Sequence, residues 1–327
     1  MGIYKKLEEE TINSISVLLN NGFSIKDILT IIEDDKNKEI IENIRIDLLE
    51  GKKIETVIIP YLNKNLAHYL VCFMQYMPFS EALSYAKNII EERKKRIKNI
   101  INILFYPVLL LIGMILGLLV LSIYLLPSIT SLSASFSSEP SYIDSSTIKN
   151  ICILSLIIFI SLILTIGILF NDKFIIGTYK KICSINRRSL LIDYYTERFV
   201  YLYSLCLDKG LSTIDSLSII SNIDERSIDS YIAKNIDAEL KKGSELIKAI
   251  ENKYLSISFI RFFNIAIKTV NPLAIINSYL EYINKYIDLK IKRIAKTIQV
   301  FVYLLIGIIV IYIYNLLLFP LNILNNI

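Results

Sequence analysis

Three stretches of the chain carry no charged side chain, and this feature limits its possible folds more than any other. Each stretch can hold an α-helix of about 20 residues, the length that crosses the hydrocarbon core of a bilayer. The most apolar of them contains fifteen Ile, Leu or Phe residues between Ile151 and Phe170. Since 54% of all residues are hydrophobic, the chain is predicted to be an all-α integral membrane protein. Its three transmembrane helices are expected within residues 99–126, 151–170 and 297–319.

The positive charges are distributed unevenly around these spans. Fifteen Lys and Arg residues lie in residues 1–98 and twenty in residues 171–296, whereas residues 127–150 contain only Lys149. Cytoplasmic segments next to membrane spans carry an excess of Lys and Arg. Residues 1–98 and 171–296 are therefore expected in the cytoplasm, and the loop at 127–150 and the tail at 320–327 on the outer side. The predicted location is the cytoplasmic (inner) membrane.

The two predicted cytoplasmic regions repeat each other. Leu19–Ile32 aligns with Leu207–Ile220 at a shift of 188 positions, with seven of fourteen positions identical. The chain is thus predicted to be a duplicated unit of cytoplasmic helical bundle plus span, with one further span between the copies. A second block, at a shift of 192, pairs Ile44, Leu48, Gly51, Ile54 and Ile58 with Ile236, Leu240, Gly243, Leu246 and Ile250.

The likeness continues into the spans. Arg96-Ile97 matches Arg293-Ile294 at a shift of 197. Prolines are expected to close the first and third spans, because proline cannot continue the hydrogen-bond ladder of a helix. The predicted span-boundary motif consists of Tyr106, Pro107, Pro127, Tyr303 and Pro320.

Each copy is expected to fold as six helices. Apolar residues recur at spacings of three and four, and no alternating run typical of a strand is found. The segments predicted in the first copy are 8–21, 24–34, 37–50, 53–59, 64–76 and 79 onward. Those in the second copy are 193–209, 212–222, 225–242, 244–252, 256–269 and 272 onward.

A turn of the form Gly-x-Ser-x-x-Asp occurs once in each copy. The glycine can adopt the left-handed conformation that ends a helix. The serine can then cap the next helix, and the aspartate favours its positive N-terminus. A capped turn explains both copies, whereas a catalytic Ser–Asp pair would lack a nearby base. The turn residues are Gly22, Ser24 and Asp27 in the first copy and Gly210, Ser212 and Asp215 in the second.

Residues that could support catalysis are few. The single histidine, His68, is expected to be structural, and no glycine-rich phosphate-binding motif is present. The Ser146–Lys149 segment matches S-x-x-K, but its companion motifs are missing, so the match is attributed to chance. No catalytic residue, cofactor or metal site is therefore expected. The small net charge of +5 gives no reason to expect nucleic acid as a partner.

The order of domains and spans, together with a few local motifs, resembles one family: the inner-membrane platform proteins of type IV pilus, type II secretion and competence pseudopilus machines. The local motifs are Leu19–Leu29, its twin Leu207–Leu217, and Phe105-Tyr106-Pro107. Many members carry a Gly-Glu turn before the sixth helix, where this chain has Tyr76-Met77-Pro78-Phe79 and Val270-Asn271-Pro272-Leu273. Proline can make the same break and start the next helix.

The resemblance implies a non-enzymatic scaffold without a cofactor. Such a scaffold couples a hexameric assembly ATPase in the cytoplasm to the extraction and polymerisation of pilin or pseudopilin subunits. Motion of the ATPase would pass through the rigid sixth helices to the spans. Further implied partners are alignment-complex membrane proteins, membrane lipid and other copies of the chain.

Two points stay open from the sequence. Four lysines beside glycine turns could face the ATPase or simply form a solvated surface: Lys52, Lys53, Lys241 and Lys242. The alternative function is that of a membrane subunit of an ATPase-driven transporter. Spans without charged residues argue against it, because intramembrane charges mark most transport paths.

Overall fold

The described part of the chain is entirely helical. The computed structural model describes residues 6–120, 123–124, 127–128, 131, 172–224 and 226–324. Every regular element in these ranges is a helix, which confirms the all-α prediction. The predicted span at 151–170 lies outside the described residues, as does nearly all of the predicted loop at 127–150.

The chain divides into two compact units. The first combines Met1–Ile97 with Tyr179–Ile283 and so contains most of both repeat copies. The second combines Lys98–Thr178 with Asn284–Ile327. The two copies, which the sequence predicts as separate bundles, therefore belong to one folded body.

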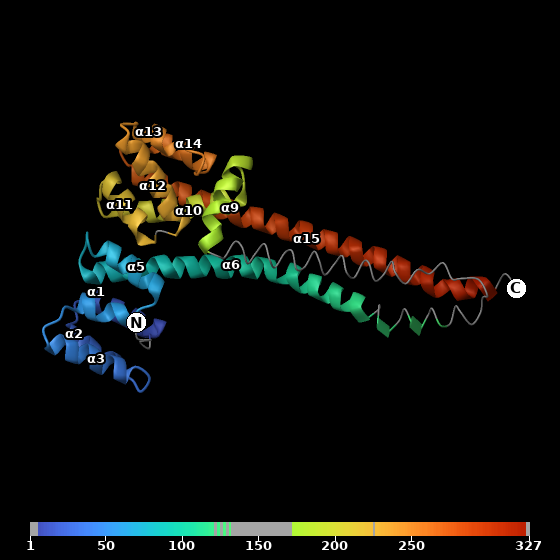
Figure 1. Ribbon diagram of the computed structural model, residues 1–327, viewed down its shortest axis with the longest axis horizontal. Coiled ribbons are helices and arrows are strands. Elements are labelled where there is room, and N and C mark those ends of the chain that lie inside the picture. The colour runs from blue at the N-terminus through green and yellow to red at the C-terminus, as the bar shows by residue number, and fades with distance from the viewer. Residues whose placement is uncertain are drawn as a thin grey trace. The chain divides into compact units, whose positions relative to one another are not determined.

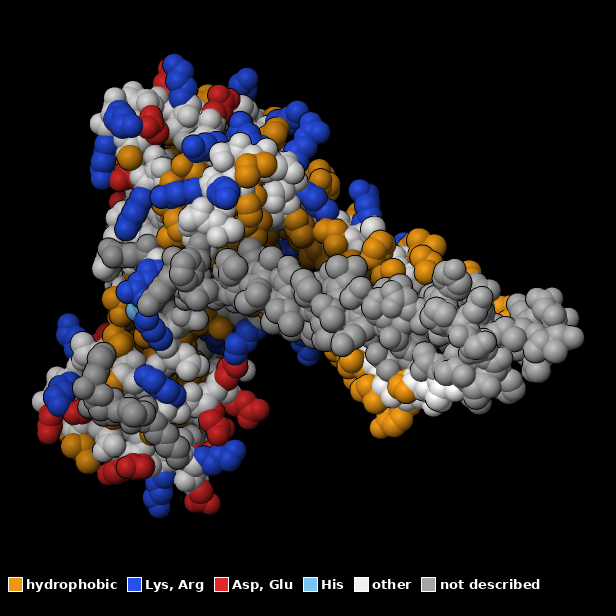
Figure 2. All heavy atoms as spheres, turned by 45° about the vertical axis from the view of Figure 1, so that its right-hand side comes forward, with side chains coloured by type: hydrophobic (Ala, Val, Ile, Leu, Met, Phe, Trp, Pro, Cys, Tyr) orange, Lys and Arg blue, Asp and Glu red, His pale blue; other side chains and the backbone are white. Residues whose placement is uncertain are grey.

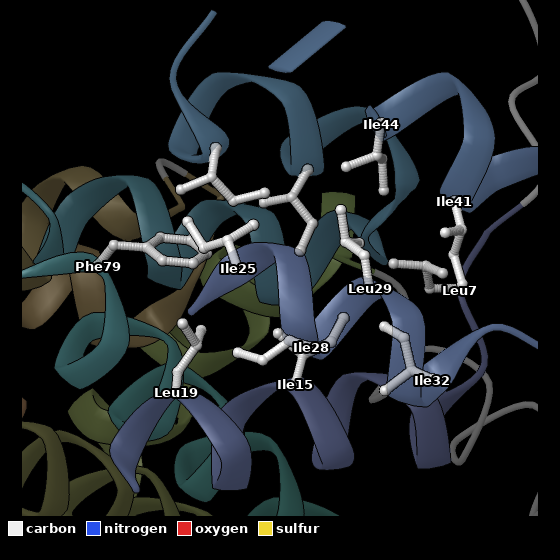
Figure 3. Close-up of a pocket in the computed structure, with 12 residues that line it drawn as sticks. Leu7, Ile15, Leu19, Ile25, Ile28, Leu29, Ile32, Ile41, Ile44 and Phe79 are labelled. Carbon is white, nitrogen blue, oxygen red and sulfur yellow. The ribbon is translucent and has the colours of Figure 1, made fainter. Parts of the chain in front are cut away.

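The helices of the first copy follow the predicted order and nearly the predicted bounds (Figure 1). They are α1 (Glu9–Asn20), α2 (Ile25–Ile32), α3 (Lys38–Leu49), α4 (Ile54–Ile58), the short 3-10 helix η1 (Ile59–Tyr61), α5 (Lys64–Phe73) and α6 (Phe79–Val120). Apolar side chains of α1, α2 and α3 meet in the core. Figure 3 shows Ile15, Ile28, Leu29, Ile41 and Ile44 pointing toward one another. All five are buried, and the residues lining the space between them are apolar, so this space belongs to the core.

The second copy repeats this order and has one additional helix in front. Its helices are α9 (Asp172–Ile185), α10 (Leu190–Asp208), α11 (Thr213–Ile223), α12 (Ile228–Lys241), α13 (Leu246–Ile250), α14 (Ile257–Ala266) and α15 (Pro272–Leu324). The sequence does not predict α9 as a separate element, and the described part of the first copy has no counterpart. The hydroxyl of Tyr179 on α9 donates to the carbonyl of Tyr254, with an oxygen–oxygen distance of 2.6 Å. This buried tyrosine joins α9 to the second copy.

Two of the described helices, α6 and α15, are long and apolar enough to cross a membrane. Only 11% of the most apolar window of each is buried within the chain. Figure 2 shows orange hydrophobic side chains gathered along these helices, whereas blue and red charged side chains cover the unit formed by the two copies. Large exposed apolar residues include Ile101, Phe105, Leu109 and Leu116 on α6 and Phe301, Leu304, Ile308 and Ile311 on α15.

The helices do not end at the prolines that were expected to close the spans. Helix α15 continues through Pro320 to Leu324, and Pro127 has helical backbone. Pro107 also lies inside α6. A proline removes one hydrogen bond from a helix, but within membrane helices neighbouring groups and small local adjustments can satisfy the freed carbonyl. Proline therefore marks the end of a membrane helix less reliably than that of a soluble one.

Candidate functional site

The repeat turn has the same geometry in both copies. Gly22 has φ +81° and Gly210 has φ +72°, conformations that favour glycine. In the first copy, Ser24 Oγ accepts a hydrogen bond from the backbone nitrogen of Asp27 at 3.2 Å and donates to Asp27 Oδ2 at 2.6 Å. The corresponding distances between Ser212 and Asp215 are 3.1 and 2.6 Å. Both hydroxyls are thus engaged in helix caps.

An ion pair between α6 and α10 joins the two copies. Arg96 Nη2 donates to Glu197 Oε1 at 2.9 Å, and the two side chains are only 13% and 10% exposed. Burial raises the pKa of Glu197, and the neighbouring Arg96 opposes this shift. Arg96 belongs to the first copy and Glu197 to α10 of the second. The second copy therefore holds the helix that leads from the first copy toward the membrane.

A second group of contacts joins the start of α6 to the repeat turn of the second copy. Tyr85 Oη donates to Asp208 Oδ2 at 3.2 Å. Lys209 Nζ lies 2.7 Å from Glu81 Oε2 and 5.1 Å from the centre of the Tyr85 ring. The hydrogen bond to Glu81 raises the pKa of Lys209. The turn at Gly210 thus connects two helices and also contacts the other copy.

Buried polar groups surround the Arg96–Glu197 pair. Within the second copy, Arg198 forms an ion pair with Asp229, and both side chains are largely buried. Within the first copy, Arg93 Nη1 donates to the hydroxyl of Tyr69 at 2.9 Å, and burial raises the pKa of this tyrosine. Because partners of both signs face one another, these charges are tolerated away from water.

In the second unit, tyrosines from equivalent positions of the two copies meet. The hydroxyls of Tyr106 on α6 and Tyr303 on α15 are 3.0 Å apart. Nearby, Asn99 Nδ2 donates to Asp288 Oδ1 at 3.1 Å. The two predicted spans therefore lie side by side here, joined by polar contacts.

The four candidate lysines do not form a single patch of unpaired charge. Lys52 pairs with Asp47 and Glu50. Lys241 pairs with Asp237 and Lys242 with Glu239. All four lysines are exposed, so they remain accessible, but three of them have carboxylates beside them in their own copy.

The described residues offer no metal centre. Groups of three or more His, Cys, Asp or Glu side chains that could hold a metal are absent from them. The described cysteines, Cys72, Cys183 and Cys206, are free and buried. Burial raises the pKa of Cys206 to about 12, so its reactive thiolate is disfavoured. His68 lies half-buried in α5.

The contacts between the copies were not among the residues predicted from sequence. A signal is nevertheless present: the charged pair Glu197-Arg198 stands inside the mostly apolar and aromatic segment Leu190–Cys206. Charged residues at such a place are rarely buried without partners. The segment identifies a polar contact, but the partner Arg96 can be found only from the fold.

Comparison with known proteins agrees with the repeat. Among curated proteins, none matches the chain significantly. The profile of the family described as "Type II secretion system (T2SS), protein F" matches residues 11–127 and again residues 199–320. The two matches begin 188 positions apart, the shift that relates the repeat turns, and together cover most of the sequence. The chain therefore belongs to the type II secretion system (T2SS) protein F family, the non-enzymatic inner-membrane platform proteins of type II secretion and type IV pilus machines.

Proposed function

We propose that the two copies together form the docking body for the assembly ATPase, and that α6 and α15 guide pilin-like subunits in the membrane. The observation that carries this proposal is the buried ion pair between Arg96 and Glu197. It holds the helix of the first span against the second copy. A displacement of either copy by the ATPase would therefore act on α6.

The membrane helices present suitable surfaces for apolar partners. Their apolar side chains are exposed within the chain, and a Cβ placed on Gly113 or Gly117 would meet nothing within 4 Å. Helices in a bilayer associate by close packing and a few polar contacts. The hydrophobic helices of pilin or pseudopilin subunits could pack on these faces and leave again, since no buried polar group would have to be separated.

The proposed orientation places both copies in the cytoplasm. Basic residues crowd the approach to each described span, at Arg93–Lys98 and at Lys290–Lys296. Such clusters stay on the cytoplasmic side and attract anionic lipid. In this orientation the four candidate lysines would face the compartment that contains the ATPase.

Binding of the full-length protein, purified in detergent, to the assembly ATPase of the same genome tests this proposal. We expect micromolar affinity that changes with the bound nucleotide. Lys52→Glu with Lys53→Glu, and Lys241→Glu with Lys242→Glu, should each weaken binding if those lysines face the ATPase. Lys38→Glu, an exposed lysine elsewhere on the first copy, serves as the control. Absence of binding by the folded protein in every nucleotide state would contradict the proposal.

Coupling through the helices has its own test. A flexible Gly-Ser insertion after Asn99 or after Thr297 should abolish filament assembly or secretion while the protein still inserts into the membrane. The same insertion at Pro140, within the predicted outer loop, should be tolerated. Normal assembly with either helix insertion would show that the ATPase does not act through these helices.

A further inference from the structure

The two copies contact each other through unlike surfaces. The first copy contributes α5 and α6, and the second contributes α10 and α11, since α5 lies against α11 and α6 carries the partners of Glu197 and Lys209. Each copy also has the equivalent of the surface that the other copy uses: α1 and α2 correspond to α10 and α11, and α14 and α15 correspond to α5 and α6. Figure 1 shows α2 and α14 at opposite ends of this unit, with α5 and α6 between them. The α1–α2 face of the first copy and the α14–α15 face of the second thus point away from this contact.

Equivalent positions on these faces can be assigned by counting residues. The shift of 188 relates α1 and α2 to α10 and α11. A shift of 193 relates α5 to α14, because both helices have ten residues. The same shift relates the first residues of α6 and α15, Phe79 and Pro272, whereas farther along these helices Arg96 and Arg293 match at a shift of 197.

Apolar residues lie exposed at positions whose equivalents are buried. Ile219 on α11 is 2% exposed, whereas its counterpart Ile31 on α2 is 57% exposed. Cys72 on α5 is 7% exposed, whereas its counterpart Ile265 on α14 is 55% exposed. Large apolar side chains at such positions suit a contact that the chain cannot make with itself.

The polar contacts of the internal interface also have compatible counterparts. Asp208 and Lys209, which bind Tyr85 and Glu81, correspond to Asn20 and Asn21. Tyr85 and Glu81 correspond to Ser278 and Ala274. At these four positions neutral residues thus replace the polar partners, whereas Glu9, the counterpart of Glu197, keeps its charge and pairs with Lys94 of its own copy. A contact between the outer faces would bury no unpaired charge at these positions, which would otherwise be costly.

We infer that the α1–α2 face of one chain docks on the α14–α15 face of a second copy of this chain, repeating the internal contact between molecules. This inference rests on the proposed function as a membrane-embedded platform. A contact between unlike faces either closes into a ring or continues without end. Chains inserted in the same orientation in one membrane are related by a translation in its plane or by a rotation about its normal, and we infer a rotation that closes into a ring.

Cysteine cross-linking in native membranes tests the pairing of the faces. The background lacks all four native cysteines, at positions 72, 152, 183 and 206. With a short bifunctional maleimide, the double variant Ile31→Cys/Ile265→Cys should give a ladder of bands ending at the number of subunits in the ring. Coexpressed single variants Ile31→Cys and Ile265→Cys should give a dimer and no larger species. Each single variant alone should give no cross-link.

A control variant separates this pairing from random collisions. Leu49 is 76% exposed on the first copy, and its counterpart, Lys241, pairs within its own helix. Leu49→Cys with Ile265→Cys should give no ladder. Self-cross-linking of Ile31→Cys alone would overturn the inference, because it indicates a two-fold contact between like faces. Equal cross-linking of the Leu49 control would overturn it too.

A second measurement avoids the cysteine-free background. By native mass spectrometry of the detergent-solubilised wild type, we expect an oligomer, and Ile31→Glu should reduce it to the 37.6 kDa monomer, whereas Leu49→Glu should not. A monomeric wild type, or an Ile31→Glu oligomer that is unchanged, would overturn the inference. Binding of the ATPase to the Ile31→Glu monomer would show that the proposed function stands independently.

Discussion

Glu9 and Glu197 occupy the same position of the two copies, 188 residues apart, in different surroundings. Glu9 on α1 pairs with Lys94 of its own copy, and both side chains are more than half exposed. Glu197 on α10 pairs with Arg96 of the other copy, and both are largely buried. The neighbouring helices differ in the same way, since Ile31 is exposed and Ile219 buried.

The comparison shows what duplication preserved and what it changed. The repeat turn and the serine cap that follows it are the same in both. The surfaces differ, since α11 packs on α12 of its own copy and on α5 of the other copy, whereas Ile31 on α2 stays exposed. The repeat turn is thus a property of each copy, whereas the buried Arg96–Glu197 pair exists only because the two copies meet.

The largest difference in stability loss is expected when the basic partner of each glutamate is removed. Arg96→Ala leaves the carboxylate of Glu197 buried without its partner and should lower the free energy of unfolding by about 3–5 kcal/mol at neutral pH. Lys94→Ala breaks an exposed pair and should cost about 0–1 kcal/mol. Denaturation of the detergent-solubilised protein, followed by circular dichroism, measures both. Equal losses would show that the two pairs are buried alike.

Truncating the equivalent isoleucines of the two copies should also change the free energy of unfolding by different amounts. Ile219→Ala leaves a cavity in a packed region and should cost about 2–5 kcal/mol. Ile31→Ala alters an exposed side chain and should change the free energy of unfolding by about 0.5 kcal/mol or less. The measurement requires a protein concentration at which the chain is monomeric. A large loss for Ile31→Ala in the monomer would mean that the α2 face is covered within the chain.

The pH dependence should report the burial of Glu197. Burial raises the pKa of this carboxyl in the folded protein, so the folded state binds the proton more tightly than the unfolded state. Its contribution is fully present below the unfolded pKa of about 4.3 and is lost as pH rises through the folded pKa.

Comparison with a variant isolates this contribution. Between about pH 4 and pH 7, the wild type should lose stability relative to Glu197→Gln, by about 1.4 kcal/mol for each unit by which the pKa is raised. Unfolding curves of both proteins across this range provide the measurement. A difference that does not change with pH would argue against a raised pKa.

The smallest effect should be equal in the two copies. Ser24→Ala and Ser212→Ala each remove an N-cap and should lower the free energy of unfolding by about 1 kcal/mol. The same unfolding assay measures this. A cost confined to Ser212→Ala would indicate that its turn owes its importance to the contact with α6 and not to capping.

The sequence predicts the local structure of this chain well. Helices α1 to α5 and α10 to α14 lie close to their predicted ranges because spacing, glycine and serine act within a few residues. Helix α9 escapes prediction because it follows directly on an apolar stretch. Helix α15 runs past Pro320 to Leu324, because in a membrane helix neighbouring groups can satisfy the carbonyl that a proline leaves free.

The contact between the copies could not be predicted from such local patterns. Arg96 lies in a basic cluster that the positive-inside rule explains completely, and nothing in its neighbourhood points to Glu197, 101 residues away. Long-range pairing depends on how the copies pack. The repeat predicts that each copy folds alike, but not which faces meet.

The separation between Arg96 and Glu197 also affects how the protein is made. Translation at about 5–20 residues per second places roughly 5 to 20 s between the synthesis of the two residues. During that interval, α6 enters the bilayer without the anchor that later holds it. The first span is therefore positioned at first by lipid and its basic flank alone. Its final position is fixed only after the second half of the chain has been synthesised.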